Sequence, residues 1–204
     1  MDLRLEAVKS FQVKPITIQE ATPIITKWHY SGSTNGLLSE YCFGLFHKSH
    51  LIGSMIYGGM GMANVWKKYA EKRDEVIELR RLACIDLTPT NTESYFIGKT
   101  LRYLKKNTLI KKVISYADTF HNHTGIIYRA SNFTHLGLTN PGRIIKSASG
   151  KMYHDKAIRT FYTNKDGVKQ LKPFAKRLKE ELRLGVAQYI NTPGKHIYCY
   201  TLCK

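Results

Sequence analysis

The feature that most constrains the fold is a long helical pattern set between two strand-like segments in the middle of the chain. The segments VIELRRLACID (76–86) and KKVISYAD (111–118) are both rich in apolar and β-branched residues and are typical of strands. Between them, apolar residues recur at helical spacing after a Thr/Asn/Thr start: Phe96, Ile97, Leu101 and Leu104. A strand–helix–strand succession predicts an α/β fold in which helices cover a central sheet.

Further elements flank this centre. Residues 3–13 alternate like a strand, and Thr17 with Glu20 forms a capping-box pattern that starts a helix. Two apolar runs around the polar turn HKSH predict a β-hairpin, so the sheet is mixed. A helix begins near Pro173, and KHIYCYTL closes the chain as a strand. No linker interrupts this order. We therefore expect one domain over residues 1–204, with a basic insertion near residues 141–160.

Composition excludes several classes of protein. The 43% of hydrophobic residues argue against disorder, and no apolar run reaches the roughly 20 residues that span a bilayer. The N-terminus lacks the apolar centre of a signal peptide. The four cysteines, Cys42, Cys84, Cys199 and Cys203, contain no CxxC pair. We expect reduced, buried thiols in a cytoplasmic protein.

The charge is the strongest global signal. The net charge is +17, and residues 141–204 carry 14 basic and 4 acidic residues, more than half of the surplus. Solubility alone needs roughly 2–8 units in a small domain. Such a field attracts phosphate backbones, so nucleic acid is the favoured partner. A membrane surface is the weaker alternative, because no strongly amphipathic basic helix supports it.

The segment ISYADTFHNHTGIIYRASNF (114–133) raises a question of chemistry. Asp118 ends a predicted strand, where open α/β sheets place ligands and catalytic groups, and His121 and His123 follow it. A carboxylate and a loop histidine supply part of a 2-His-1-carboxylate iron site, with His29 as a third ligand. Without a fixed metal-ligand spacing, the same residues fit an aspartate that caps the next turn beside exposed histidines.

Three other segments carry polar groups with two interpretations. His29 and Tyr30 end the first helix, where a histidine also interacts with the helix dipole. Strand alternation places Glu78 and Arg80 on one face and Arg81 on the other, as a structural ion pair or as functional groups. The helix start at residues 90–99 offers Thr92, Ser94 and Lys99 as an anion site, but ordinary N-capping explains the same residues equally well.

The ordered set of motifs resembles a known family. The segments are WHYSG, LIGSMIYG, ELRRLA, NTESYFIGKTLRYL, VISYAD with H-x-G-x-IYRASNF, and GKHIYCYTL, in order over residues 24–203. Together they resemble the phage Mom-like DNA modification proteins, which have the fold of the general N-acetyltransferase (GNAT) superfamily. The resemblance implies a GNAT-like, mostly antiparallel, twisted sheet flanked by helices.

The resemblance also implies an activity. The family converts the exocyclic amine of adenine in DNA to a carbamoylmethyl (acetamido) form, which shields phage DNA from host restriction. It implies acetyl-CoA on the donor side, an iron requirement, and a phage or prophage origin in a bacterial host. The product joins nitrogen to a methyl-derived carbon, which simple acyl transfer cannot do.

The resemblance implies roles for individual residues of the matching motifs. They imply catalytic roles for His29, Tyr30, Ser94, Asp118 and Tyr128, with Tyr128 as the general acid. They imply cofactor contacts for Arg81, Thr92, Ser94 and Lys99, and a metal site of His29, Asp118 and His123. One departure matters: LTPTNTES stands where acetyltransferases carry their Gly-rich pyrophosphate loop, so backbone amides with the helix-start residues have to replace it.

A DNA substrate needs further contacts. Adenine inside a duplex must be flipped out or presented in a single strand. The candidate stacking groups, each of which also fits a core position, are Tyr30, Tyr57, Trp66 and Phe120. The candidate phosphate contacts are Lys146, Lys151, Lys156 and Arg159.

Two other functions fit the composition. One is an ordinary GNAT-type N-acetyltransferase that acts on a small amine or a protein, and the other is a non-catalytic basic DNA-binding protein. The complete site set counts against the binding protein. The missing pyrophosphate loop and the +17 charge count against the acetyltransferase. The oligomeric state, including a homodimer, stays open.

Overall fold

The computed structural model describes residues 2–62 and 64–202 and divides the chain into two compact units. Unit 1 joins the chain up to residue 138 to the chain from residue 196 onward, and unit 2 comprises residues 139–195. The basic insertion expected near 141–160 falls inside unit 2. The single-domain organisation stays a prediction.

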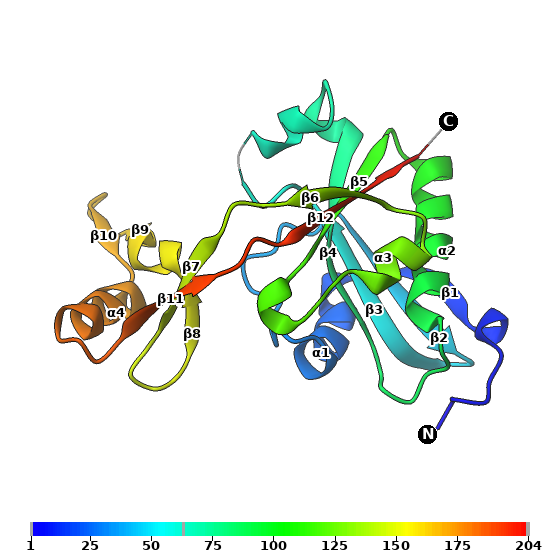
Figure 1. Ribbon diagram of the computed structural model, residues 1–204, viewed down its shortest axis with the longest axis horizontal. Coiled ribbons are helices and arrows are strands. Elements are labelled where there is room, and N and C mark those ends of the chain that lie inside the picture. Colours follow the sequence, from blue (N-terminus) through cyan, green and yellow to red (C-terminus); the bar gives the residue numbers. More distant parts are fainter. Residues whose placement is uncertain (1, 63, 203–204) are drawn as a thin grey trace. The chain divides into compact units, whose positions relative to one another are not determined.

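The described part of unit 1 is built on a seven-stranded sheet (Figure 1). Its order is β1 (Gln12–Ile16), β2 (Tyr41–His47), β3 (His50–Gly58), β4 (Val76–Cys84), β5 (Lys112–Ala117), β12 (His196–Thr201) and β6 (Thr134–Leu138). Only the β4–β5 pair is parallel, as expected for strands joined through a helix, and the other pairs are antiparallel. The predicted hairpin is β2–β3, and its strands meet at the His47–His50 pair.

Helices cover both faces of this sheet, which confirms the predicted mixed, mostly antiparallel sheet flanked by helices (Figure 1). On one face lies α1 (Ile18–Trp28), whose Ala21 and Ile25 pack with residues of β2, β3 and β4. On the other lie α2 (Thr92–Asn107) and α3 (Ile126–Ala130), in the larger core cluster. Short 3-10 turns complete unit 1: Val8–Ser10, Val65–Lys68, Arg73–Glu75 and Thr119–His121.

The parallel pair sets up the functional part of unit 1. The register of β4 with β5 runs from Val76↔Lys112 to Leu79↔Ser115 and then stops. The Ser115 hydroxyl donates to the Leu79 carbonyl at this last pair, over 3.2 Å. Beyond it, β5 continues on β12 and β4 continues on β3. The two strands therefore leave a gap in the sheet that side chains and ligands can occupy.

Unit 2 has a small sheet, a hairpin and a helix. The three-stranded sheet has the order β11 (Gln188–Thr192), β7 (Gly142–Lys146), β8 (Met152–His154), and the hairpin pairs β9 (Phe161–Thr163) with β10 (Lys169–Leu171). The helix α4 (Pro173–Arg183) starts at the predicted proline, and a 3-10 turn covers Asp155–Arg159. Its core is a separate cluster around Ile145, Leu178 and Ala187.

Some expectations from the sequence are wrong, and one concerns a residue outside the described ranges. The strand expected at residues 3–13 is wrong for most of its length, because Val8–Ser10 form a 3-10 turn and β1 begins only at Gln12. Leu3 and Phe11 are both buried, so these apolar side chains reach the core although they do not lie on a strand. Cys42 and Cys84 are buried and unpaired, whereas Cys203 lies outside the described residues. No helix in the described ranges is long and apolar enough to cross a membrane.

The capping box of α1 is confirmed and allows a stability test. The Glu20 N–H donates to Thr17 Oγ1 over 3.2 Å, and the Thr17 N–H donates to the Glu20 carboxylate over 2.7 Å. Thr17→Ala should lower the free energy of unfolding by about 1 kcal/mol, because a helix N–H loses its acceptor. Thr17→Ser keeps the acceptor and should stay near the wild type in urea titrations. Equal losses in both variants would contradict the capping role.

Candidate active site

A cavity of about 530 Å³ lies where β4 and β5 separate. Its walls come from the end of α1, the middle of β4, the end of β5 and the segment leading into α3. They are lined by Trp28, His29, Tyr30, Leu79, Arg80, Arg81, Leu82, Tyr116, Ala117, Asp118, and seven residues in the range 122–128. A pocket of this size, mostly apolar with a few convergent polar groups, is typical of a small-molecule site. The predicted residues His29, Tyr30, Arg81, Asp118, His123 and Tyr128 are thus brought together.

His29 is held at the C-terminal end of α1 by its own loop. Its backbone N–H closes the helix on the Ile25 carbonyl, and its ring Nδ1 accepts the Ser31 N–H over 3.0 Å. The Ser31 hydroxyl lies 2.8 Å from the same nitrogen. Because Nδ1 accepts a backbone N–H, the neutral ring carries its proton on Nε2. His29 is therefore a hydrogen-bond donor through Nε2, which does not match the predicted metal ligand.

The surroundings also keep His29 neutral. The pKa of His29 is lowered from 6.5 to about 4, chiefly by burial, and the Arg81 charge and the rings of His123 and His121 act in the same direction. Neutral imidazole is a known electrophilic partner for a carbonyl or a similar oxygen in enzyme sites. A neutral Nε2 donor at pH 7 follows from both the geometry and the electrostatics.

Tyr30 is the centre of an aromatic cluster at the cavity mouth. Its ring centroid lies 4.2 Å from His29, 4.5 Å from His121 and 5.0 Å from His123. Burial raises the pKa of Tyr30, and the Asp118 charge adds to that rise. The ring is nonetheless 47% exposed. His121, to which the family resemblance gave no role, therefore packs against Tyr30, although it does not line the cavity.

Asp118 combines the two interpretations that its sequence position left open. It is buried at the end of β5, its Oδ1 accepts the Phe120 N–H over 3.1 Å, and its carbonyl accepts the N–H groups of His121 and His123. It thus caps the turn that follows. Its carboxylate also lines the cavity and interacts with Tyr30. Capping holds the carboxylate in place, which any catalytic role also requires.

Tyr128 lies on α3, at the inner end of the cavity. Burial raises its pKa to about 12, opposed by a hydrogen bond with Ser115. Its ring packs against Tyr198 at 5.3 Å and Phe133 at 5.6 Å. The phenol therefore keeps its proton at neutral pH and is available as a proton donor. The position of the predicted general acid is chemically suitable.

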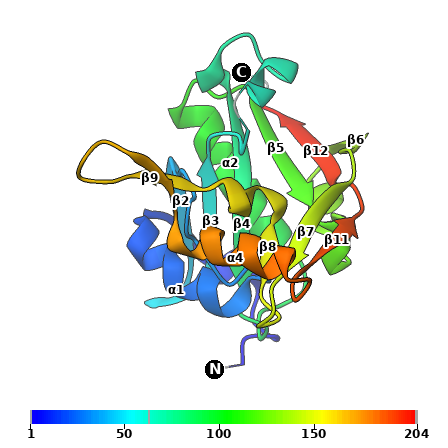
Figure 2. The same ribbon diagram turned by 90° about the vertical axis from the view of Figure 1, so that its left-hand side faces the viewer.

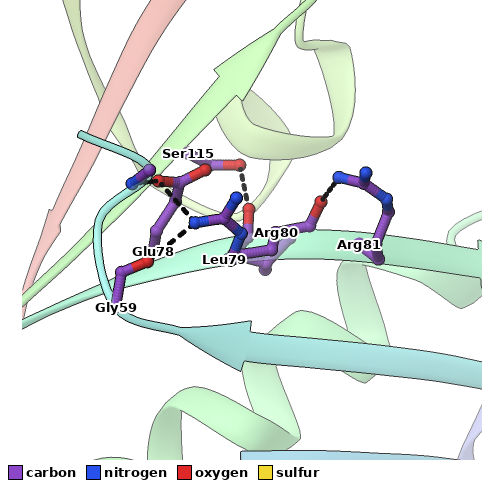
Figure 3. A network of polar contacts seen from close by, with 7 residues as sticks. Gly59, Glu78, Leu79, Arg80, Arg81 and Ser115 are labelled. Atoms are coloured by element: carbon purple, nitrogen blue, oxygen red, sulfur yellow. Dashed lines mark hydrogen bonds and ion pairs between the residues drawn. The ribbon is translucent and has the colours of Figure 1, made fainter. Parts of the chain in front are cut away.

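The two arginines of β4 both line the cavity, and this corrects the expected alternation. The β3–β4 register shifts between Ile56↔Arg81 and Tyr57↔Leu79, so Arg80 is the extra residue of a β-bulge. Figure 3 shows Arg80 held between the Gly59 carbonyl, at 2.8 Å, and the Glu78 carboxylate, at 3.7 Å. Arg81 donates to the Arg80 carbonyl over 2.7 Å. A bulge of this kind is not marked by a glycine or a proline, so it could not be predicted from the sequence.

The predicted cofactor residues at the start of α2 do not line this cavity. The Thr92 hydroxyl donates to the Pro89 carbonyl over 2.7 Å, and the Ser94 hydroxyl donates to the Asn91 carbonyl over 3.0 Å. Lys99 is exposed and its ammonium lies 5.3 Å from the centroid of the Tyr95 ring. These hydroxyls therefore stabilise the local turn, but they donate to carbonyls and do not cap the N–H groups of the helix, so the N-capping interpretation is wrong for them. Roles for Thr92, Ser94 and Lys99 in binding a cofactor stay predictions.

Two stacking candidates are not at the site. Tyr57 is fully buried, and its hydroxyl lies 2.7 Å from the Thr100 hydroxyl, so the stacking prediction for Tyr57 is wrong. Trp66 is half-buried and contacts the Lys67 ammonium instead of the cavity. Phe120 is 36% exposed and packs edge-on against His121, beside Tyr30. Trp28 and Tyr116, which line the cavity, were missed because their sequence context also fits a core.

The metal prediction does not fit the arrangement. No group of three His, Cys, Asp or Glu side chains among residues 2–62 and 64–202 is placed to hold a metal ion. The Nδ1 of His29 accepts the Ser31 N–H, and the neutral ring then carries its proton on Nε2, so neither ring nitrogen has a lone pair free for a metal. The set of His29, Asp118 and His123 therefore does not form the expected iron site.

Comparisons with known proteins identify the family. The family model described as "Mom protein family" matches residues 10–204. The chain belongs to the Mom family. It is 28% identical over 152 residues to the methylcarbamoylase mom of Escherichia phage Mu, a match that covers 72% of this chain and 61% of that protein. The chain thus spans about three-fifths of the length of this curated relative.

Solved structures place the Mom-family chain among the GNAT folds and confirm the predicted fold class. A GNAT family acetyltransferase of Elizabethkingia anophelis with acetyl-CoA bound matches with a TM-score of 0.51 at 10% identity, over 94% of this chain and 98% of that one. An acetyltransferase of Bacillus subtilis in complex with CoA matches with a TM-score of 0.50 at 10% identity, over 95% and 98%. At this identity the likeness concerns the fold alone.

The start of α3 offers a steric test of the site. Gly125 has φ +74°, and a Cβ added there would collide with the ring of Tyr198, whose hydroxyl donates to the Thr124 carbonyl over 2.6 Å. Gly125→Ala should lower the free energy of unfolding by about 2–4 kcal/mol, through backbone strain and overpacking.

The control for this test is Gly36→Ala, which has the same φ of +74° and open space around the added Cβ. It should cost only the backbone strain, about 1 kcal/mol. Urea denaturation measures both. Similar costs at the two glycines would show that the Tyr198 contact is not tight.

The lowered pKa of His29 predicts a pH dependence. The unfolded chain takes up a proton at this side chain near pH 6.5, but the folded protein does so only near pH 4. Stability should therefore fall as the pH drops from 6.5 to 4. In His29→Gln this part of the decline should disappear. An NMR titration that placed the His29 pKa at or above 6.5 would contradict the assignment.

Proposed function

We propose that this chain is a Mom-type DNA-modifying transferase that converts the exocyclic amine of adenine in DNA to the carbamoylmethyl form. In a phage this would protect the genome from host restriction. The observation that carries the proposal is the grouping of His29, Tyr30, Asp118 and Tyr128 around one cavity in a member of the Mom family. The name of its phage Mu relative, a methylcarbamoylase, supports the transferred group, and the +17 charge supports DNA as the substrate.

The cavity is suited to a flipped base. Adenine inside a duplex cannot reach a cavity wall, so the enzyme has to extrude it or act on a single strand. A volume of about 530 Å³ is ample for one purine and part of a donor. The half-exposed ring of Tyr30, backed by His29 and His121, provides a flat surface on which the base would stack.

The residues of the chain would then manage the protons. Formation of a bond to N6 of adenine releases one N6 proton, and the Asp118 carboxylate is the anionic acceptor in the cavity wall. The Nε2–H of His29 would polarise an oxygen of the donor, because the ring is neutral. Tyr128 would protonate a basic leaving group, since its pKa of about 12 keeps it protonated until such a group forms.

Acetyl-CoA is proposed as a ligand on the donor side, from the GNAT fold. Acyl transfer from it to N6 would give an acetamide of adenine, in which nitrogen is joined to the carbonyl carbon. The carbamoylmethyl product needs a bond to the methyl-derived carbon and an additional amide nitrogen, so acetyl-CoA alone does not balance it. Iron dependence is implied by the family resemblance only, and no step is assigned to a metal.

An N-acetyltransferase that acts on a small amine or a protein is the second candidate function. It is favoured by the likeness to acetyltransferase folds with CoA or acetyl-CoA bound. The same residues would serve it, with Tyr128 protonating the CoA thiolate. Its product would carry an acetyl group instead of an acetamido group, and its substrate would not be DNA.

The experiment that tests the proposal is to express the full chain with a plasmid and to analyse the digested nucleosides by mass spectrometry. A carbamoylmethyl adenine should appear with the wild type. Asp118→Asn should reduce it by about 10²–10⁴-fold, because the proton acceptor is lost while the side chain keeps its shape. Tyr128→Phe should also reduce it.

The matched control is Asp74→Asn, which changes an exposed carboxylate in the turn before β4, outside the cavity. It should leave the product at the wild-type amount, and thermal melting of all variants should check folding. Unmodified adenine with the wild type, in iron-supplemented cells, would refute the proposal. An acetylated protein or an acetylated small amine, with unmodified adenine, would instead favour the second candidate.

A further inference from the structure

The β9–β10 hairpin of unit 2 is a rigid element that none of the roles above uses. Its turn is organised by Asn164, whose side-chain oxygen accepts the N–H groups of Asp166, over 3.1 Å, and Val168, over 2.7 Å. The backbone closes the same turn, from Asn164 N–H to the Val168 carbonyl and from Gly167 N–H to the Asn164 carbonyl. The hairpin is therefore preorganised without help from a large core.

The hairpin exposes aromatic side chains. Phe161 is 43% exposed, Tyr162 40% and Val168 53%, and every residue of β9 is exposed. The core cluster of unit 2 contains none of the three. Figures 1 and 2 both show the turn of this hairpin standing away from α4. Aromatic side chains that do not serve the core of their own unit are available to a partner.

Lysines accompany these aromatic side chains. The Lys169 ammonium lies 5.0 Å from the centroid of the Phe161 ring, and Lys165 is exposed in the turn. The hairpin is tied to α4 by the Lys172 N–H, which donates to the Thr160 carbonyl over 2.9 Å. Along α4, Lys176 and Lys179 follow at helical spacing on one exposed face. Hairpin and helix thus form one basic element, residues 161–183.

The charge of unit 2 is not balanced internally. It contains thirteen lysines and arginines against four acidic residues, a net charge of +9. Three of the acids form ion pairs with neighbours (Asp155 with His154, Glu180 with Arg183, Glu181 with Arg177), and Asp166 lies in the hairpin turn. In the described ranges, no ion pair involves Lys165, Lys169, Lys176 or Lys179. Such a surface attracts polyanions.

We propose that the β9–β10 hairpin enters the major groove of duplex DNA, with Phe161 on the face of the ribbon towards the base edges, Tyr162 on the opposite face, and Lys165 and Lys169 on the flanking phosphates. A two-stranded ribbon fits the major groove, which is about 12 Å wide. The exocyclic amine of adenine is displayed in this groove. The lysines of α4 extend the contact along the backbone. The proposal deepens the proposed function, on which it rests for DNA as the partner.

The predicted phosphate contacts fit the same surface. Lys146, Lys151, Lys156 and Arg159 are all exposed in unit 2. They would supply affinity without sequence information, whereas aromatic side chains on a rigid hairpin discriminate groove shape and base edges. The hairpin is thus the part of unit 2 that can prefer some sequences over others.

The test is binding of a fluorescent 20-base-pair duplex to the full chain, by anisotropy over a salt series. Phe161→Ala with Tyr162→Ala should weaken binding by about tenfold or more and leave the salt slope unchanged. Lys165→Ala with Lys169→Ala should reduce the slope of log K against log salt by about 2, since each phosphate contact contributes about 0.9.

Two control pairs match these variants. Leu184→Ala with Val186→Ala removes two exposed apolar side chains of unit 2 outside the hairpin and should leave affinity unchanged. Lys67→Ala with Lys68→Ala removes the same charge from unit 1 and should leave the slope unchanged. Wild-type affinity in both hairpin variants would overturn the proposal. So would equal loss in hairpin and control pairs, or binding to anionic vesicles in preference to the duplex.

A second measurement guards against misfolding of the double variants. Phe161→Trp keeps an aromatic side chain, and its emission should change when the duplex is added, relative to wild-type fluorescence. Leu184→Trp, outside the hairpin, should show no such change. An unresponsive Phe161→Trp in a protein that binds DNA would overturn the hairpin contact.

These outcomes separate the two proposals. Hairpin-dependent DNA binding with no modified adenine in the plasmid would refute the proposed function and leave the hairpin contact standing. Modified adenine together with full activity and affinity in the hairpin variants would leave the function standing and refute the hairpin contact.

Discussion

The parallel pairing of β4 with β5, which ends at Leu79↔Ser115, is the constraint on which the rest of the structure depends. A helix must connect two parallel strands, and α2 does so while it fills one face of the sheet. Beyond the last pair, the backbone groups of the two strands no longer satisfy each other. The cavity lies at that point, and the polar side chains of the candidate site come from the elements that surround it.

The site is held by backbone contacts more than by side-chain pairs. The Ser31 N–H selects the His29 tautomer, the carboxylate and carbonyl of Asp118 cap its own loop, and Gly125 lets α3 approach the Tyr198 ring. Each contact restricts a polar group before any ligand arrives, which lowers the cost of organising a reaction. Burial then shifts the pKa of His29 downward and those of Tyr30 and Tyr128 upward, so the titrating groups stay uncharged at neutral pH.

Unit 2 has the opposite character. Its core is small, its aromatic side chains are largely on the surface, and its charge is strongly positive. Under the proposed function, the cavity of unit 1 would carry out the chemistry and the basic, aromatic surface of unit 2 would bind the substrate. The likeness to GNAT folds alone does not predict such a division, because GNAT folds serve many substrates.

Local pattern and composition were enough to predict the order of elements around the parallel pair, the capping box of α1, the charge surplus and the family. Motif position also drew attention to His29, Tyr30, Asp118 and Tyr128. The folded structure was needed to show that Arg80 bulges, that Tyr57 is buried, that His29 offers a donor, and that Thr92 and Ser94 bond their own turn. Each of these depends on which neighbour, often distant in sequence, satisfies a hydrogen bond or fills a space, and no local pattern encodes that.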